Sequence, residues 1–145
     1  MLKVEIENHL LNETIEFFFK MELTNGKQSR HRTRFVKLLN DNLERVAEEQ
    51  DALIKEHCHL DEQGNPKQTE EGQYDFKDFE AFINDRTELY EEKVIIDDSN
   101  SQVMLMTIRD ILDNYEGELS ERKAVLYEHL CEAFKVDEEL EDESE

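Results

Sequence analysis

The sequence predicts a helix-dominated α+β fold in the order β-α-α-α-β-α-α, with a long antiparallel helical hairpin and a two-stranded ribbon. The 145 residues include only one Pro and four Gly, which is too few turn formers for a sandwich or barrel of many short strands. No Gly or Pro interrupts Ser29–Leu60, where apolar residues recur at helical spacing. Strand patterns occur at residues 2–7 and 94–96.

The first two elements are a strand and a short helix. Apolar and charged residues alternate over residues 2–7, which is typical of a strand with one covered face. From His9 the apolar residues follow one helical stripe, which consists of Leu11, Ile15, Phe18 and Phe19. Asn25-Gly26 is expected to end this helix. Of the consecutive Phe17–Phe19, two are expected in the core and one against a neighbouring helix, with a partner surface or a homo-oligomer seam as the alternative.

A long helix is predicted over Ser29–Leu60, with Ser29 as its N-cap. Three- and four-residue steps define a seam like that of a coiled coil, formed by Val36, Leu39, Leu43, Val46, Gln50, Leu53, His57 and Leu60. About 30 residues make a rod of roughly 45 Å, at 1.5 Å per residue. Such a rod would project beyond a compact domain of this size.

A polar connector, Asp61–Gly72, separates the long helix from a shorter one that begins near Asp75 or Asp78 and continues to Tyr90. The shorter helix is expected to lie antiparallel on the long one, so that the hairpin spans about residues 29–92. The seam could close within this hairpin or between two chains, which leaves a homo-oligomer open.

The remaining chain is expected to form a second strand and two helices. The β-branched run at 94–96 could pair with the first strand, and helices follow from Ser101 to about Tyr115 and from Ser120. Residues 1–136 are therefore expected to form a single domain. Residues 137–145 carry seven acids in nine positions, so we expect them to be a disordered tail.

No catalytic or cofactor-binding motif is found. The chain contains no Gly-rich phosphate loop, His-Glu-x-x-His, Gly-x-Ser-x-Gly or Cys-x-x-Cys, so we expect a protein that is not an enzyme and holds no cofactor. The best metal candidate is His57-Cys58-His59, with His129 and Cys131 as further donors. Consecutive helical side chains point about 100° apart, so these donors cannot converge on one ion from an intact helix.

The sequence also predicts where the protein acts. It has no apolar run of the roughly 20 residues needed to span a bilayer, and its first residues lack the apolar stretch of a signal peptide. We therefore expect no membrane association and a cytoplasmic location. Both cysteines are expected to be small buried hydrophobes rather than a disulfide.

A cluster of cations stands out in a chain of net charge -21. Residues 25–40 contain no acid and five basic residues, namely Lys27, Arg30, Arg32, Arg34 and Lys37. These five are the predicted partner-binding residues, because the start of a helix also offers N–H groups to an acidic partner or phosphate. The alternative is that they pair with the protein's own carboxylates.

The overall acidity has two interpretations. A dense carboxylate surface can imitate the phosphate array of nucleic acid and occupy a basic groove on another protein. Alternatively, acidity keeps a small protein soluble. Direct nucleic-acid binding is disfavoured, because the cation cluster would have to overcome the repulsion of a far larger negative charge elsewhere.

Several segments resemble a family of small proteins from phages and prophages of Gram-positive bacteria, domain-of-unknown-function family 1617. They are Ser29–Leu39, Arg45–Glu49, Leu60–Lys67 and Ile111–Tyr115. The resemblance covers nearly the whole chain except the acidic tail. It consists of several short sequence segments and includes no catalytic or binding motif. It implies a viral origin and a small accessory or late-operon protein, without catalytic residues to transfer.

Three functional hypotheses follow. The first is a non-enzymatic phage accessory protein that contacts a phage or host protein in the bacterial cytoplasm, through the hairpin and the cation cluster. The second is an acidic, nucleic-acid-mimicking inhibitor of a host defence or regulatory protein. The third is a metal-dependent enzyme built on the His and Cys positions.

Overall fold

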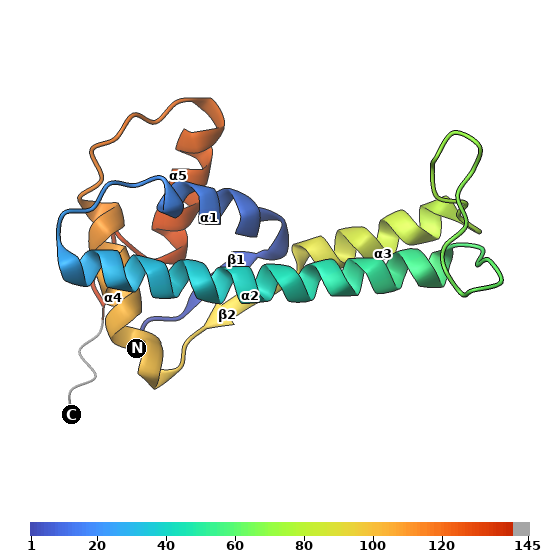
Figure 1. Ribbon diagram of the computed structural model, residues 1–145. Coiled ribbons are helices and arrows are strands. Elements are labelled where there is room, and N and C mark those ends of the chain that lie inside the picture. The colour runs from blue at the N-terminus through green and yellow to red at the C-terminus, as the bar shows by residue number, and fades with distance from the viewer. Residues whose placement is uncertain (141–145) are drawn as a thin grey trace.

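The computed structural model describes residues 1–140 and has the predicted helix-dominated α+β fold (Figure 1). A body contains both chain ends of this described part, and a helical arm projects from it. The elements are β1 (Val4–Glu7), α1 (Leu11–Phe19), α2 (Gly26–His57), α3 (Phe79–Glu91), β2 (Lys93–Ile96), α4 (Gln102–Asp113) and α5 (Glu121–Ala133), with short 3-10 turns η1 (Asn8–Leu10) and η2 (Ser99–Ser101).

The long helix exists, but it begins one turn earlier than predicted. Its N-cap is Asn25, whose side-chain oxygen accepts a hydrogen bond from the N–H of Gln28 at 3.1 Å. Asn25-Gly26 therefore starts α2 rather than ending α1, which stops at Phe19. The predicted cap, Ser29, lies within the helix. The 32 residues of α2 correspond to about 48 Å.

The helical hairpin is present, and its seam closes within the chain. α3 lies antiparallel along the outer half of α2 (Figure 1), and Asp78 caps α3 by accepting a hydrogen bond from its first turn at 3.2 Å. The two polar positions of the seam, Gln50 and His57, both have partners on α3. The hydroxyl of Tyr90 donates a hydrogen bond to Gln50. His57 Nε2 lies 2.6 Å from a carboxylate oxygen of Asp85.

The ribbon consists of β1 paired antiparallel with β2. Val4 lies opposite Ile96 and Ile6 opposite Val94, and all four side chains are buried. The inner half of α2 crosses the same core, where Phe35 contacts Phe18 of α1 edge-to-face with ring centroids 5.3 Å apart. α2 is thus anchored in the body by one half and forms the arm with the other.

The three consecutive phenylalanines of α1 differ in burial, as the geometry of a helix requires. Phe17 and Phe18 are buried, which confirms that two of them belong to the core. Phe19 is exposed, so the expected contact with a neighbouring helix is wrong. Three consecutive residues cover about 200° of a helix, which is wider than the face that α1 buries.

The first residues of the predicted tail, 137–140, lie among the described residues. The guanidinium of Arg109 on α4 donates to the main-chain carbonyls of Lys135, Val136 and Glu138, and Leu140 packs against the core. These carbonyls follow the end of α5, where helical partners are missing. Residues 141–145 of the predicted tail lie outside the described residues.

Candidate interaction site at the end of the hairpin

The predicted polar connector, Asp61–Gly72, is part of a small folded unit at the end of the arm. Within residues 58–78, three short segments are bridged to one another, with Cys58 opposite Phe76, Leu60 opposite Pro66 and Gln68 opposite Tyr74. Main-chain N–H groups donate to carbonyls across the segments at 2.8–3.0 Å, from His59 to Asp75, Lys67 to His59, Asp75 to Lys67 and Lys77 to His57. Each segment is therefore bonded to both of the others.

Two turns of similar design connect these segments, at residues 61–65 and 69–73. In each, the fourth residue is a glycine with φ of 82°, a conformation that favours glycine. The glycine N–H donates to the carbonyl of the first residue of its turn, at 3.0 and 2.9 Å. The first residue, Asp61 or Thr69, also accepts main-chain hydrogen bonds through its side chain. Two such patterns eight residues apart were the sequence signal for this unit.

A small hydrophobic core joins this unit to the helices. Ile54, Cys58 and Phe82 are buried together, and the ring of Phe76 stacks on that of Phe82 with centroids 4.5 Å apart. Arg86 places its guanidinium 5.5 Å from the centroid of Phe82. Packing from both helices thus limits the movement of the three bridged segments.

Three large apolar side chains remain exposed at this end of the arm, two on the folded unit and one at the start of α3, and they define the tip surface. Relative exposures are 41% for Leu60, 42% for Tyr74 and 58% for Phe79. Side chains two residues apart share a face of an extended segment, so Leu60 continues the face of Cys58 and Tyr74 that of Phe76. The small core thus extends into an exposed apolar rim. This apolar rim is a candidate surface for contact with another protein.

The position of Leu60 differs from the predicted seam. It was expected as the last buried position of the long helix, but α2 ends at His57 and Cys58 already has extended backbone. The bridge between Cys58 and Phe76 replaces the last helical hydrogen bonds. This places Leu60 on the tip surface.

The surroundings of the tip surface are strongly acidic. Residues 58–80 contain seven carboxylates and two lysines. The carboxylates belong to Asp61, Glu62, Glu70, Glu71, Asp75, Asp78 and Glu80. An apolar surface surrounded by negative charge is complementary to a partner with cationic residues around an apolar centre.

The predicted cation cluster separates into two parts. Arg32 is half-buried, and its guanidinium donates to the carbonyls of Phe18 at 3.1 Å and Met21 at 2.5 Å. These carbonyls lie at and just beyond the C-terminal end of α1, where no helical donor remains. Arg32 therefore holds α1 against α2 and does not belong to a free surface.

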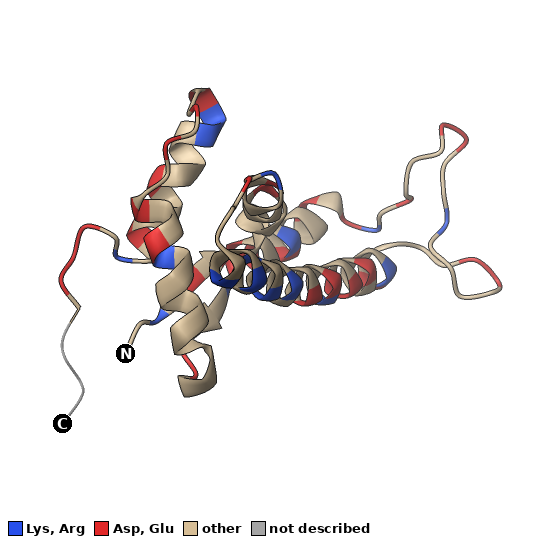
Figure 2. Ribbon diagram, turned by 60° about the vertical axis from the view of Figure 1, so that its left-hand side comes forward, with Lys and Arg blue, Asp and Glu red and all other residues tan. Residues whose placement is uncertain are grey.

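The other four residues are exposed on one side of α2 and define the basic patch, Lys27, Arg30, Arg34 and Lys37. Figure 2 shows these cations on the first turns of α2 and carboxylates on the following turns. Self-pairing accounts for one of the four, because Lys37 Nζ lies 3.4 Å from a carboxylate oxygen of Asp41. Within residues 1–140, no ion pair forms at Arg30 or Arg34.

His31 lies behind the basic patch and is buried. Its Nδ1 is 2.8 Å from the hydroxyl oxygen of Thr107. That hydroxyl donates its own proton to the carbonyl of Val103 at 2.9 Å, so Nδ1 of His31 must carry the donated hydrogen. Burial lowers the pKa of His31, and the nearby charges of the basic patch lower it further. His31 is a neutral core residue and not a ligand.

The described residues offer limited nucleophilic or metal chemistry. Burial raises the pKa of both thiols, Cys58 and Cys131, which keeps them protonated and weakly reactive. The predicted His57-Cys58-His59 donors separate, since Cys58 is buried and His59 is exposed. Among residues 1–140, one trio of possible ligand atoms lies within 4.8 Å, on Glu56, His57 and Asp85. Two of these three, His57 and Asp85, already form the 2.6 Å contact that joins α2 to α3.

Comparison of the chain with protein-family models, curated proteins and solved structures finds no significant match. Among the described residues, no helix combines the length and the apolar composition needed to cross a bilayer.

Proposed function

We propose that this chain is a non-enzymatic, phage-encoded accessory protein that binds another protein, of the phage or of its bacterial host, through the tip surface. The observation that carries the proposal is the exposure of Leu60, Tyr74 and Phe79 at the end of a projecting arm. Burying such side chains against a partner removes apolar area from water, which is the main favourable term in association.

The arm supports this proposal because it presents the tip surface away from the body (Figure 1). Its two helices are joined by the Tyr90–Gln50 hydrogen bond and by the contact of His57 with Asp85. A braced arm loses little conformational freedom on binding, which favours affinity. The basic patch at the other end of α2 is a second contact within the same proposal.

The viral origin and the host cytoplasm as the place of action rest on the resemblance to family 1617. Two of the resembling segments bear on the proposed surfaces. Ser29–Leu39 includes most of the basic patch, and Leu60–Lys67 forms the first turn of the tip. Neither segment suggests a catalytic role.

The experiment is capture of partners by the tagged chain from bacterial cells in which the phage is growing. We expect one stoichiometric partner, lost when Tyr74→Ser and Phe79→Ser are combined. The matched control combines Val103→Ser and Val125→Ser, because these valines are 61% and 60% exposed but lie on the body. Equal capture by both double variants would refute the role of the tip surface.

An acidic inhibitor of a nucleic-acid-binding host protein is the second candidate. It is favoured by the exposed carboxylates along the middle and outer turns of α2 (Figure 2), which are Asp41, Glu44, Glu48, Glu49 and Asp51. Binding would then weaken steeply with salt and compete with duplex DNA. Combining Glu44→Gln, Glu48→Gln and Asp51→Asn would abolish capture, whereas the tip variant would retain it.

A further inference from the structure

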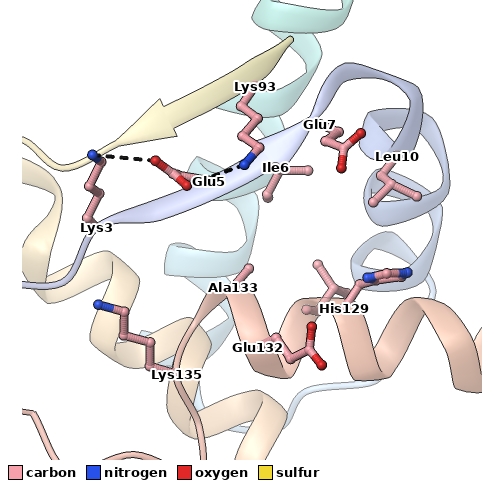
Figure 3. A pocket seen from close by; sticks show the side chains of 11 residues that line it. Lys3, Glu5, Ile6, Glu7, Leu10, Lys93, His129, Glu132, Ala133 and Lys135 are labelled. Atoms are coloured by element: carbon pink, nitrogen blue, oxygen red, sulfur yellow. Dashed lines mark ion pairs between the residues drawn. The ribbon is translucent and has the colours of Figure 1, made fainter. Parts of the chain in front are cut away.

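A groove on the body lies along the edge of β1 that is not paired with β2. It has a volume of about 320 Å³ and lies between β1 and α5 (Figure 3). Its apolar lining comes from Ile6 of the strand, Leu10 of η1, and Leu130 and Ala133 of α5. Side chains of both faces of β1, such as Ile6 and Glu5, border the groove. Only an edge of the strand can meet both faces at once.

The main chain of β1 has hydrogen-bonding groups directed to this edge. The N–H of Asn8 donates to the carbonyl of Glu92 at 2.8 Å, so this pair continues the β1–β2 ladder. Hydrogen-bonded and non-hydrogen-bonded pairs alternate in an antiparallel ladder. Val4 and Ile6 therefore bond to β2, and the N–H and C=O of Glu5 point out of the ribbon.

The charges along the groove differ between its two ends. Lys3 and Lys135 lie at the end where β1 begins, and Glu7 and Glu132 lie toward the other end (Figure 3). Glu5 forms ion pairs with both Lys3 and Lys93, at 3.4 and 3.7 Å, so one carboxylate in the middle is shared by two lysines and the end at Lys3 and Lys135 keeps an excess of positive charge. At the other end, Glu7 lies 3.0 Å from His9 Nε2, and Glu132 adds a second carboxylate. An occupant therefore meets positive charge at one end and negative charge at the other.

We propose that the groove binds an extended segment of a partner protein, which adds to β1 as a third, antiparallel strand. The segment would carry a basic residue beside Glu7, apolar residues at alternate positions toward Leu10 and Ala133, which are the partly exposed apolar residues of the lining, and an acidic residue between Lys3 and Lys135. Strand addition between a free strand edge and a helix gives affinity through the main chain and selectivity through the alternating side chains. The site lies on the body, so it is independent of the tip surface.

A single strand fits this position better than a whole second copy of the chain. α5 borders the groove opposite β1 (Figure 3), whereas a second ribbon would need that space for both of its strands. The order basic, apolar, any, apolar, acidic also occurs in β1 itself, Lys3–Glu7. Because β1 of a second copy could therefore compete for the groove, self-association of the protein must be measured together with peptide binding.

The test uses the full chain and two capped peptides, Lys-Val-Thr-Val-Glu and its charge-reversed control Glu-Val-Thr-Val-Lys. In an NMR titration, we expect the first peptide to cause saturable shifts at the Glu5 and Glu7 amides, with at least about tenfold weaker binding of the control. Lys3→Glu combined with Lys135→Glu should weaken binding of the first peptide to the same extent. Equal binding of both peptides, or no binding of either, would overturn the proposal.

Two proline variants test the strand geometry. Glu5→Pro removes the N–H that faces the groove, and Ile95→Pro removes the N–H at the equivalent ladder position on the opposite edge. We expect Glu5→Pro to abolish peptide binding and Ile95→Pro to retain it. If Glu5→Pro does not fold, the proposal is tested by the difference in binding between the two peptides and by the loss of binding in the variant that combines Lys3→Glu and Lys135→Glu. Retained peptide binding by a folded Glu5→Pro variant would overturn the peptide site. Self-association of the unmodified protein through this edge, abolished by Glu5→Pro, would also overturn it.

Discussion

Phe76 and Phe82 stack with ring centroids 4.5 Å apart and planes inclined by 30°. Phe76 belongs to the last bridged segment of the tip, and Phe82 lies one turn into α3. This contact joins the segment that carries Tyr74 to the helix that carries Phe79. The geometry of the tip surface therefore depends on a ring that is itself buried.

Replacing that ring should loosen the tip without unfolding the body. Deletion of a packed Phe side chain costs about 3–5 kcal/mol, and the Phe82 cluster is separate from the main core. For Phe82→Ala we expect faster amide hydrogen exchange at His59, Lys67 and Asp75, with unchanged protection in α4. Phe79→Ala is the control, since Phe79 is largely exposed, and equal exchange in both variants would contradict the role of Phe82.

The two arginines near the start of α2 should differ in their effect on stability. Arg32→Ala removes charge-assisted hydrogen bonds to the end of α1, and we expect a loss of about 1.5 kcal/mol in the free energy of unfolding. Arg34→Ala should change it by about 0.5 kcal/mol or less, because Arg34 is exposed. Urea denaturation of both variants measures this difference, and equal losses would count against it.

The start of α2 can be tested in the same way. Asn25→Ala removes the side-chain cap, which typically costs about 1 kcal/mol. Ser29→Ala should be close to neutral, because Ser29 lies inside the helix and Ala has the higher helix propensity. A larger loss for Ser29→Ala than for Asn25→Ala in thermal unfolding would place the helix start at the position that the sequence suggested.

His31 should make stability depend on pH below about 6.5. Its pKa is lowered in the folded protein, so the unfolded chain takes up the proton first as the pH falls. The free energy of unfolding therefore decreases from about pH 6.5 down to the folded-state pKa. We expect His31→Asn to reduce the stability difference between about pH 7.5 and about pH 5.5. The exposed His129→Asn serves as the control, and an identical difference in both variants would contradict this assignment.

Much of the fold could be predicted from local patterns. Period-two alternation located β1, and the uninterrupted helical spacing that includes Leu39 and Val46 located α2. The hairpin followed from a polar interruption and a capping residue, Asp78. These features depend on neighbours along the chain, so the sequence alone contains the signal.

The candidate sites depend on contacts between distant segments. Arg32 has the same local sequence signal as Arg34, yet only Arg32 reaches the end of α1. The bridge between Cys58 and Phe76 belongs to a set of bridged segments that exposes Leu60.

Local periodicity thus determined which residues form helices and strands, because the 3.6- and two-residue repeats are properties of the backbone. Tertiary packing alone decided which charges and apolar side chains stay exposed. Burial and main-chain pairing join residues far apart in the sequence, as the groove between β1 and α5 shows.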